Sequence, residues 1–193
     1  MVLAQGKPPL LNNPTNTNFG QPPPPPGQIA PPPPGNRVAS QPPTVNPMSS
    51  IPISNASLAV ATAKKAKEFL TAGKIWTMTG PRGETDVKAA ITYEGIAVAV
   101  LHFNPTDGSL LPLGFHPLTS GATVKLETIK SSLPGIIHSL EVLNGAEYRE
   151  PESVWVVPLA YKGMIVAHLK VYVDGIHIVP DYPANQEMKA YGR

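Results

Sequence analysis

The chain has 193 residues, of which 41% are hydrophobic and 25 are prolines, and its formal net charge is +2. A charge this small does not call for a nucleic-acid or anionic-membrane partner. The absence of cysteine excludes disulfide scaffolds, thiol nucleophiles and zinc sites built on thiolates. No apolar run approaches the roughly 18 residues of a membrane-spanning helix, and the first residues do not resemble a signal peptide. We therefore expect a cytoplasmic protein without a membrane span.

The composition changes at about residue 55. Residues 1–55 contain 16 of the prolines, one aromatic residue, two charged residues and no acid. Such a segment has too little apolar surface to offset the entropy that is lost when its backbone becomes ordered. We therefore predict a disordered proline-rich arm over residues 1–55 and one folded domain over residues 56–193. The second part is long enough for its own hydrophobic core.

Two proline tracts stand out in the arm. They consist of Pro22, Pro23, Pro24, Pro25 and Pro26, and of Pro31, Pro32, Pro33 and Pro34. Because proline fixes φ, each tract is predicted to form a stiff polyproline II rod. Rods of this kind dock into aromatic-lined grooves, which makes the tracts candidate partner-binding residues. The alternative is a semi-rigid spacer without a dedicated receptor.

The pattern after residue 55 predicts an α+β fold in which antiparallel sheet dominates. A helix is expected over residues 58–70, with Gly73 as its C-terminal cap. The residues expected on its buried face are Leu58, Ala61, Ala66, Phe69 and Leu70. A second helix is expected from Ser132 to about residue 144, with Pro134 in its first turn. Alternating residues and turn signals predict strands over residues 74–78, 86–93, 96–103, 109–113, 153–161, 164–173 and 176–179, and residues 123–129 fit either a strand or the start of the second helix.

The two sets of strands resemble each other at an offset of 68 residues. Tyr93, Gly95, Val98, Ala99 and Leu101 correspond to Tyr161, Gly163, Val166, Ala167 and Leu169. With one residue of slippage, Asp107-Gly108 corresponds to Asp174-Gly175. One hypothesis is therefore an internal repeat of a helix and a β-meander, over residues 57–117 and 131–183. The alternative is that any two hairpins share glycine turns and β-branched residues.

Several turn residues have a structural explanation. Gly95 and Gly163 are expected in tight turns that other residues resist. Asp107 and Asp174 precede Gly108 and Gly175, and aspartate in such a turn bonds to the local backbone.

The sequence contains no recognisable catalytic, metal-binding or cofactor-binding motif. The five histidines are His102, His116, His138, His168 and His177. None of them forms a local metal-ligand pattern, and we expect structural or surface roles for all five. We therefore assign no catalytic residue, metal ligand or cofactor.

The aromatic residues of the second half divide into two groups. Trp155 lies in an apolar run and is expected in the core. Tyr182 and Tyr191 lie near prolines at the end of the chain, where a docking tail is the more natural interpretation. RNA binding would call for basic residues among these aromatics, and they are scarce there.

These observations favour a non-enzymatic interaction or assembly protein, such as a scaffold or structural subunit, which binds a protein partner or another copy of itself. The first alternative is a small-molecule-binding or sensory module with a pocket between the two repeats. An enzyme without a local motif is the third hypothesis.

Overall fold

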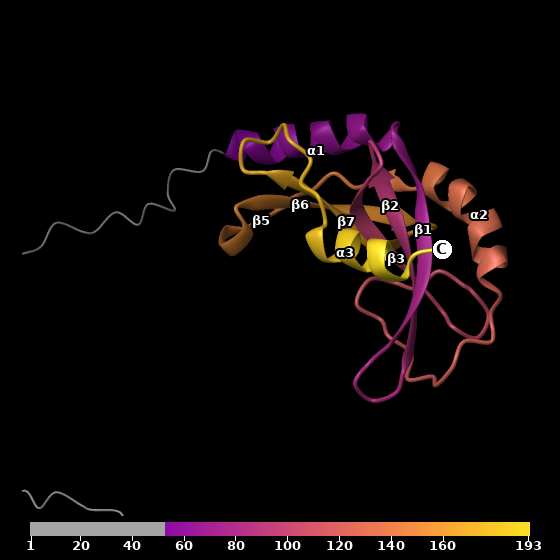
Figure 1. Cartoon of the computed structure of the whole chain (residues 1–193). Helices are drawn as coiled ribbons and strands as arrows, with labels where there is room; N and C mark the ends of the chain where they lie inside the picture. The colour runs from indigo at the N-terminus through magenta and orange to yellow at the C-terminus, as the bar shows by residue number, and fades with distance from the viewer. Residues whose placement is uncertain (1–52) are drawn as a thin grey trace, which may run out of the picture. The chain divides into compact units, whose positions relative to one another are not determined.

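The computed structural model describes residues 53–193. Both proline tracts, and the arm apart from its last three residues, lie outside the described residues. The described part combines three α-helices with two antiparallel sheets, as expected for an α+β fold (Figure 1). None of the helices between Ile53 and Arg193 has the length and apolarity required to cross a membrane.

Helix α1 (Ile53–Lys67) begins earlier than the sequence predicted and buries a different face. Its buried residues are Ala59, Ala63 and Ala66, which lie on one face at helical spacing. Small side chains allow the helix to approach the sheet of β6 and β7 closely. Of the residues expected on the buried face, Leu58 is 41% exposed and Ala61 is exposed as well, whereas Ala66 is buried as predicted. Residues 53–55, which the sequence division assigned to the arm, belong to the helix.

The first sheet has the order β1 (Leu70–Thr79), β2 (Thr85–Tyr93), β3 (Ile96–Phe103). The predicted ranges of β2 and β3 are confirmed to within one residue. Gly73 is not a helix cap, because it lies within β1 at an irregular point of the ladder. A Cβ atom at Gly73 would lie 2.8 Å from the Cβ of Ala90, so glycine permits a close approach of the two strands there.

The second sheet is built around β6 (Val154–Tyr161), which pairs with β7 (Met164–Tyr172) on one side. On the other side it pairs with two short strands, β4 (Glu141–Val142) and β5 (Glu147–Arg149). A 3₁₀ turn, η2 (Glu150–Glu152), leads from β5 into β6. The return strands predicted over residues 109–113 and 176–179 are reduced to single bridges, Phe103 with Leu110 and Val171 with Ile178.

The hairpins β2–β3 and β6–β7 share their geometry. Each turns through two residues with positive φ, Glu94-Gly95 in one and Lys162-Gly163 in the other, where the glycines have φ of +80° and +79°. Positive φ at both central residues is the geometry of a type I′ turn. Each hairpin also shifts register at one point, between Ile91 and Thr92 and between Leu159 and Ala160. The corresponding residues lie 68 positions apart in the chain.

Helix α2 (Leu126–His138) starts before the expected position and also ends earlier. Pro134 lies inside the helix rather than in its first turn. Ile129, Leu133 and Ile137 are buried at intervals of four residues, and this apolar stripe packs alongside β1. The burial of these three side chains outweighs the cost of the missing proline N–H. Residues 126–129, which fitted either a strand or a helix, are helical.

A third helix, α3 (Tyr182–Tyr191), was not predicted from the sequence. Asp181 caps it by accepting a hydrogen bond of 3.0 Å from the backbone N–H of Ala184, and Pro183 lies in its first turn. Ala184 is buried against Trp76, Ala90 and Ala97. Helix α3 therefore covers one face of the first sheet, while the main core fills the space between the other face, the second sheet, α1 and α2.

Candidate functional sites

An apolar groove lies at the end of α1, beside the β2–β3 turn and the segment after β7. Its volume is about 540 Å³. It is lined by Thr62, Lys65, Ala66, Phe69, Tyr93, Glu94, Ile96, Val98, Ile176, His177, Ile178 and Pro180. Phe69, Ile96 and Ile176 are 60%, 47% and 54% exposed. Three large apolar side chains are therefore left partly uncovered around one depression.

Local structure explains why these side chains are exposed. Phe69 was expected on the buried face of a helix, but α1 ends at Lys67 and Phe69 lies in the turn before β1. Ile96 is the first residue of β3, directly after the type I′ turn. Ile176 follows the Asp174-Gly175 turn, in which the Asp174 carboxylate accepts a hydrogen bond from the Ile176 N–H at 2.9 Å.

The Asp174-Gly175 turn is fixed to α1. The hydroxyl of Thr62 donates a hydrogen bond of 2.7 Å to the carbonyl of Gly175. A Cβ atom at Gly175 would lie 3.0 Å from the carbonyl oxygen of Asn55, and the residue has φ of +79°. The turn that the sequence singled out thus holds one wall of the groove against the helix.

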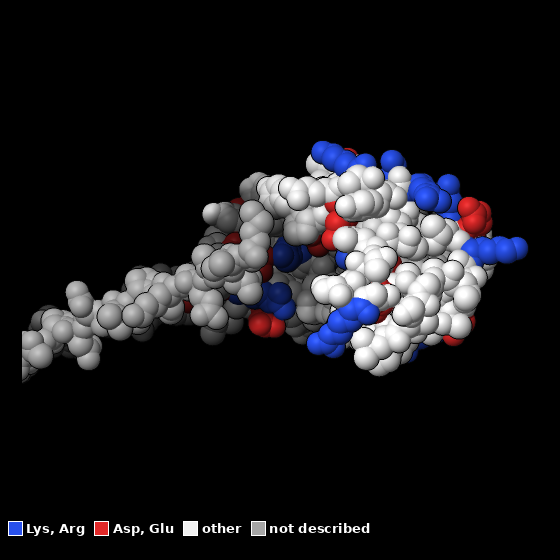
Figure 2. Space-filling view, turned by 60° about the horizontal axis from the view of Figure 1, so that its bottom comes forward, with Lys and Arg blue, Asp and Glu red and all other residues white. Residues whose placement is uncertain are grey.

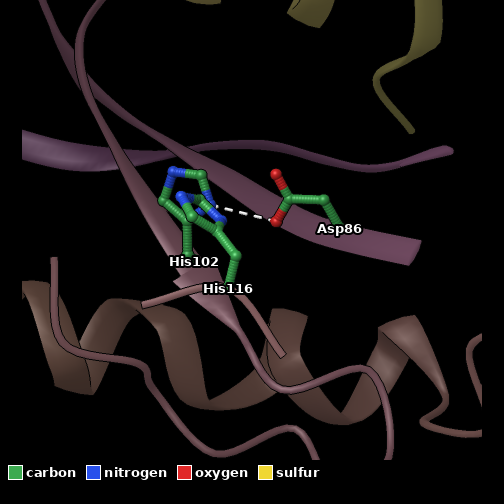
Figure 3. Close-up of side chains that lie close together, drawn as sticks. All are labelled: Asp86, His102 and His116. Carbon is green, nitrogen blue, oxygen red and sulfur yellow. Dashed lines mark hydrogen bonds and ion pairs between the residues drawn. The ribbon is translucent and has the colours of Figure 1, made fainter. Parts of the chain in front are cut away.

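A second candidate site consists of Asp86, His102 and His116 (Figure 3). One potential ligand atom from each of the three residues lies within 4.8 Å of the others. Asp86 Oδ1 and His102 Nδ1 are 3.0 Å apart, and the rings of His102 and His116 meet edge to face at 5.1 Å. Within residues 53–193, no other group of three such side chains converges in this way.

Three separate parts of the chain supply these side chains. Asp86 is near the start of β2, His102 is near the end of β3, and His116 lies in the long segment between β3 and α2. Two hydrogen bonds of 2.8 Å tether this segment to Thr85. The Thr85 N–H donates to the carbonyl of Thr119, and the Thr85 hydroxyl accepts from the N–H of Gly121. The sequence predicted no site here, because the three residues are separated by 16 and 14 positions and form no local motif.

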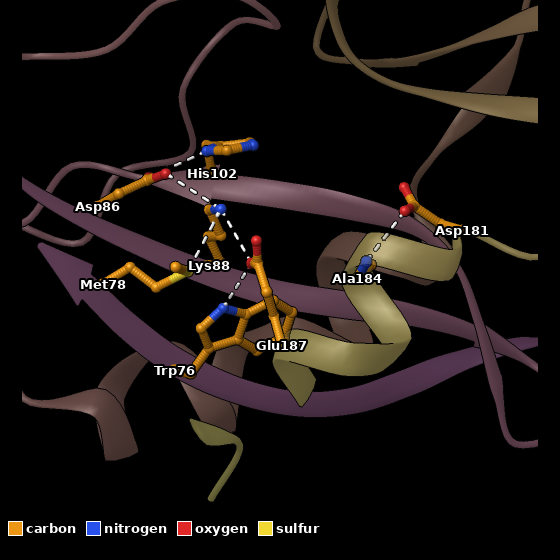
Figure 4. A network of polar contacts seen from close by, with 8 residues as sticks. All are labelled: Trp76, Met78, Asp86, Lys88, His102, Asp181, Ala184 and Glu187. Atoms are coloured by element: carbon orange, nitrogen blue, oxygen red, sulfur yellow. Dashed lines mark hydrogen bonds and ion pairs between the residues drawn. The ribbon is translucent and has the colours of Figure 1, made fainter. Parts of the chain in front are cut away.

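A polar network connects this cluster to α3 (Figure 4). Lys88 Nζ lies 3.6 Å from Asp86 Oδ2 and 2.9 Å from Glu187 Oε2. The indole N–H of Trp76 donates a hydrogen bond of 3.0 Å to the same Glu187 oxygen. Glu187 therefore balances the charge of Lys88, and Lys88 orients one oxygen of Asp86 away from the histidines.

The surroundings of Asp86 favour its ionised form. Burial opposes ionisation, but the hydrogen bond with His102 and the charges of His102, Lys88 and His116 outweigh it, and the pKa of Asp86 is lowered. The site thus offers a carboxylate beside two imidazoles.

The other residues that the sequence singled out lie apart from this cluster. Tyr182 and Tyr191 are the first and last residues of α3 and are 68% and 56% exposed, so the predicted docking tail is a helix. Gly108 has φ of +75°, and the Asp107 carboxylate accepts a hydrogen bond from the Ser109 N–H at 2.8 Å. Trp155 is buried, as predicted.

Comparison of the chain with protein-family models, with curated proteins and with solved structures found no match.

Proposed function

We propose that this chain is a non-enzymatic assembly protein in which the groove beside α1 receives a proline-rich segment from a second copy. The observation that carries the proposal is the exposure of Phe69, Ile96 and Ile176 around one groove. Exposed apolar side chains that gather in one place are characteristic of interaction surfaces.

The chemistry of the groove matches that of the chain's own proline tracts. Polyproline segments bind in grooves that present aromatic side chains, and Phe69 and Tyr93 both line this groove. The sequence between Lys7 and Arg37 carries no charge. Lys65 and Glu94 on the groove wall have opposite charges. The groove therefore has no strong net charge, and an uncharged segment can bind there without a charge partner. We therefore expect the interaction to depend only weakly on salt.

The length of the arm allows exchange between copies. Helix α1 runs for about 21 Å from Ile53 to Lys67 at 1.5 Å per residue, so the arm joins the described part at the end of α1 remote from Phe69. Residues 35–52 reach at most about 60 Å when fully extended. That length is sufficient to bring the tracts to the groove of a neighbouring copy.

The balance of charge is a further reason for preferring a protein partner to nucleic acid. Residues 53–193 contain 13 basic and 13 acidic residues. On the face drawn in Figure 2, acidic side chains lie among the basic ones. A nucleic-acid interface would present clustered positive charge instead.

A small-molecule site is the second candidate, because the groove is lined by residues from both halves of the described part. A ligand pocket encloses most of its ligand and offers a few convergent polar groups. Here three of the large apolar side chains that line the groove, Phe69, Ile96 and Ile176, are themselves about half exposed. In the described part of the chain no buried side-chain nitrogen or oxygen lacks a partner, so none is left as an anchor for a ligand. These features favour an extended polypeptide segment.

We also propose that the two halves are copies of one helix-and-meander unit. Three features support this proposal: the type I′ turn, the register shift and the isolated bridge of the first half each recur 68 residues later in the second half. In such a duplication, β4 and β5 together correspond to β1. The groove then lies where the two copies meet.

Light scattering after size-exclusion chromatography tests the assembly proposal. The full chain should elute as a discrete oligomer, and Phe69→Ser should shift it towards the monomer. Phe115→Ser is the matched control, because Phe115 is 55% exposed and does not line the groove. A wild-type monomer at all concentrations, or an oligomer that Phe69→Ser leaves intact, would contradict the proposal.

A further inference from the structure

The cluster of Asp86, His102 and His116 has no part in the proposed docking of a proline segment, and it does not line the groove. Its donor set is two imidazole nitrogens and one carboxylate. Imidazole with carboxylate suits zinc and its neighbours among the first-row transition metals, whereas magnesium and calcium prefer oxygen ligands alone.

The spacing of the donors fits a single ion. Zinc binds imidazole nitrogen and carboxylate oxygen at about 2.0–2.2 Å, which places two ligands of a tetrahedral ion about 3.4 Å apart. The observed separation of Asp86 Oδ1 and His102 Nδ1 is 3.0 Å, and all three donors lie within 4.8 Å of one another. Small side-chain rotations would bring the three donors to ligand distance.

The local charge also favours a cation. The Lys88 ammonium lies 3.6 Å from Asp86 Oδ2, and Glu187 offsets its charge at 2.9 Å. With neutral histidines, the group of Asp86, Lys88 and Glu187 carries a net charge of −1. Lys88 faces Oδ2 of Asp86, while Oδ1 faces His102, so one carboxylate oxygen stays directed at the imidazoles.

The site is accessible to solvent. Asp86 and His116 line a depression of about 250 Å³ together with Met78, Lys88 and Pro117, among others. His116 itself is exposed. Three protein ligands and an open side leave a coordination position for water or another small ligand.

We propose that Asp86, His102 and His116 bind one divalent transition-metal ion, for which zinc is the test ion. The ion joins the segment between β3 and α2, through His116, to the strands that carry Asp86 and His102. It takes the place of the hydrogen bond between Asp86 Oδ1 and His102 Nδ1, so the neutral His102 ring binds the ion through Nδ1 and carries its proton on Nε2.

Isothermal titration of zinc chloride into the untagged full chain tests this proposal. The expected result is one zinc ion per chain. His116→Ala should weaken zinc binding at least tenfold, and since His116 is exposed the variant should remain folded. Asp86→Asn should weaken binding similarly. His177→Ala is the matched control, because His177 pairs with Asp174 at 2.6 Å and, among the residues that the structure describes, no third donor joins that pair.

A second measurement separates binding at this site from adventitious binding elsewhere. Zinc should raise the melting temperature of the wild type and of His177→Ala, and it should raise that of His116→Ala much less. The proposal is overturned if the wild type binds no zinc, if His116→Ala binds it as tightly as the wild type, or if His177→Ala loses the binding.

Discussion

His102 lies directly opposite Lys88 across the ladder between β2 and β3. Asp86 precedes Lys88 by two residues and shares its face of the sheet, which makes it a diagonal neighbour of His102. This pairing exists because the register shifts by one residue at the bulge between Ile91 and Thr92. Without the shift, Lys88 would pair with Leu101 and His102 would point to the other face. One bulge thus determines whether the polar cluster can form.

The alanine face of α1 should be intolerant of larger side chains. Ala63 is fully buried, so Ala63→Leu should lower the free energy of unfolding by about 1–3 kcal/mol through overpacking. Ala61 lies on the exposed side of the same helix, and Ala61→Leu should change the stability by less than about 0.5 kcal/mol. Urea unfolding of the two variants measures the difference. Equal effects would show that α1 does not pack through this face.

The turns of the two hairpins should be equally sensitive to substitution. Apart from the glycine itself and its two chain neighbours, no atom of residues 53–193 lies within 4 Å of a Cβ built on Gly95 or Gly163, so the cost of a side chain there arises from positive φ. Valine at either position should destabilise by about 1–3 kcal/mol. Asparagine, which tolerates positive φ, should cost less. Gly145 also has open space but no positive φ, and Gly145→Val provides the control. Thermal unfolding measures the loss of stability in each variant. If Gly95→Val or Gly163→Val loses no more stability than Gly145→Val, positive φ is not the cause.

The packing of α3 on the first sheet should depend on Glu187. Glu187→Ala leaves Trp76 and Lys88 without their common acceptor, at a cost of about 1–3 kcal/mol. Hydrogen exchange should accelerate in α3. The control is Glu152→Ala, which breaks a more exposed pair with Lys170 and should cost less than about 1 kcal/mol. If both variants lose the same stability, the network does not hold α3.

Acidification should destabilise the fold through His168. Burial lowers its pKa, and the nearby charge of Arg149 acts in the same direction while Glu147 opposes it. Because the pKa is lower in the folded state, the unfolded chain binds a proton more readily. Neutral His168 therefore imposes no penalty on folding above pH 6.5, the ordinary pKa of histidine. Stability is lost as the pH falls from there through the lower pKa of His168 in the folded protein. Melting temperatures between pH 7 and 5 should fall less steeply for His168→Gln than for the wild type. An unchanged slope would contradict this assignment.

Local patterns predicted much of the sheet but little of the candidate sites. The two-residue period and the Glu94-Gly95 turn correctly located β2 and β3, because these signals depend on neighbouring residues. The bulge places Val98 of β3 as an extra residue opposite Ile91 and Thr92. It has no comparable local signal, so the placement of His102 and Asp86 on the same face of the sheet could not be derived. His116 lies in a segment without periodicity, and only tertiary contacts place it beside them.

Local sequence signals also failed to locate the starts of two helices, α2 and α3. The capping residue Asp181 and the proline at position 183 together form a helix-start signal, yet prolines and tyrosines near the end of the chain suggested a tail instead. For α2, Pro134 suggested a helix start, but the burial of Ile129 and Leu133 extends the helix before it. In both cases packing against the first sheet decided the outcome.

The most direct test of the assembly proposal is an NMR titration of the groove. In the full chain, the prolines of both tracts are replaced by alanine, which removes the chain's own competing segment. A peptide of residues 20–37 is then added to this ¹⁵N-labelled protein. We predict concentration-dependent shifts at Lys65, Phe69, Glu94, Ile96 and Ile176, and none with a peptide whose tract prolines are replaced by alanine. Shifts confined to other parts of the chain, or equal shifts with the alanine peptide, would contradict the proposal that this groove binds a proline-rich segment.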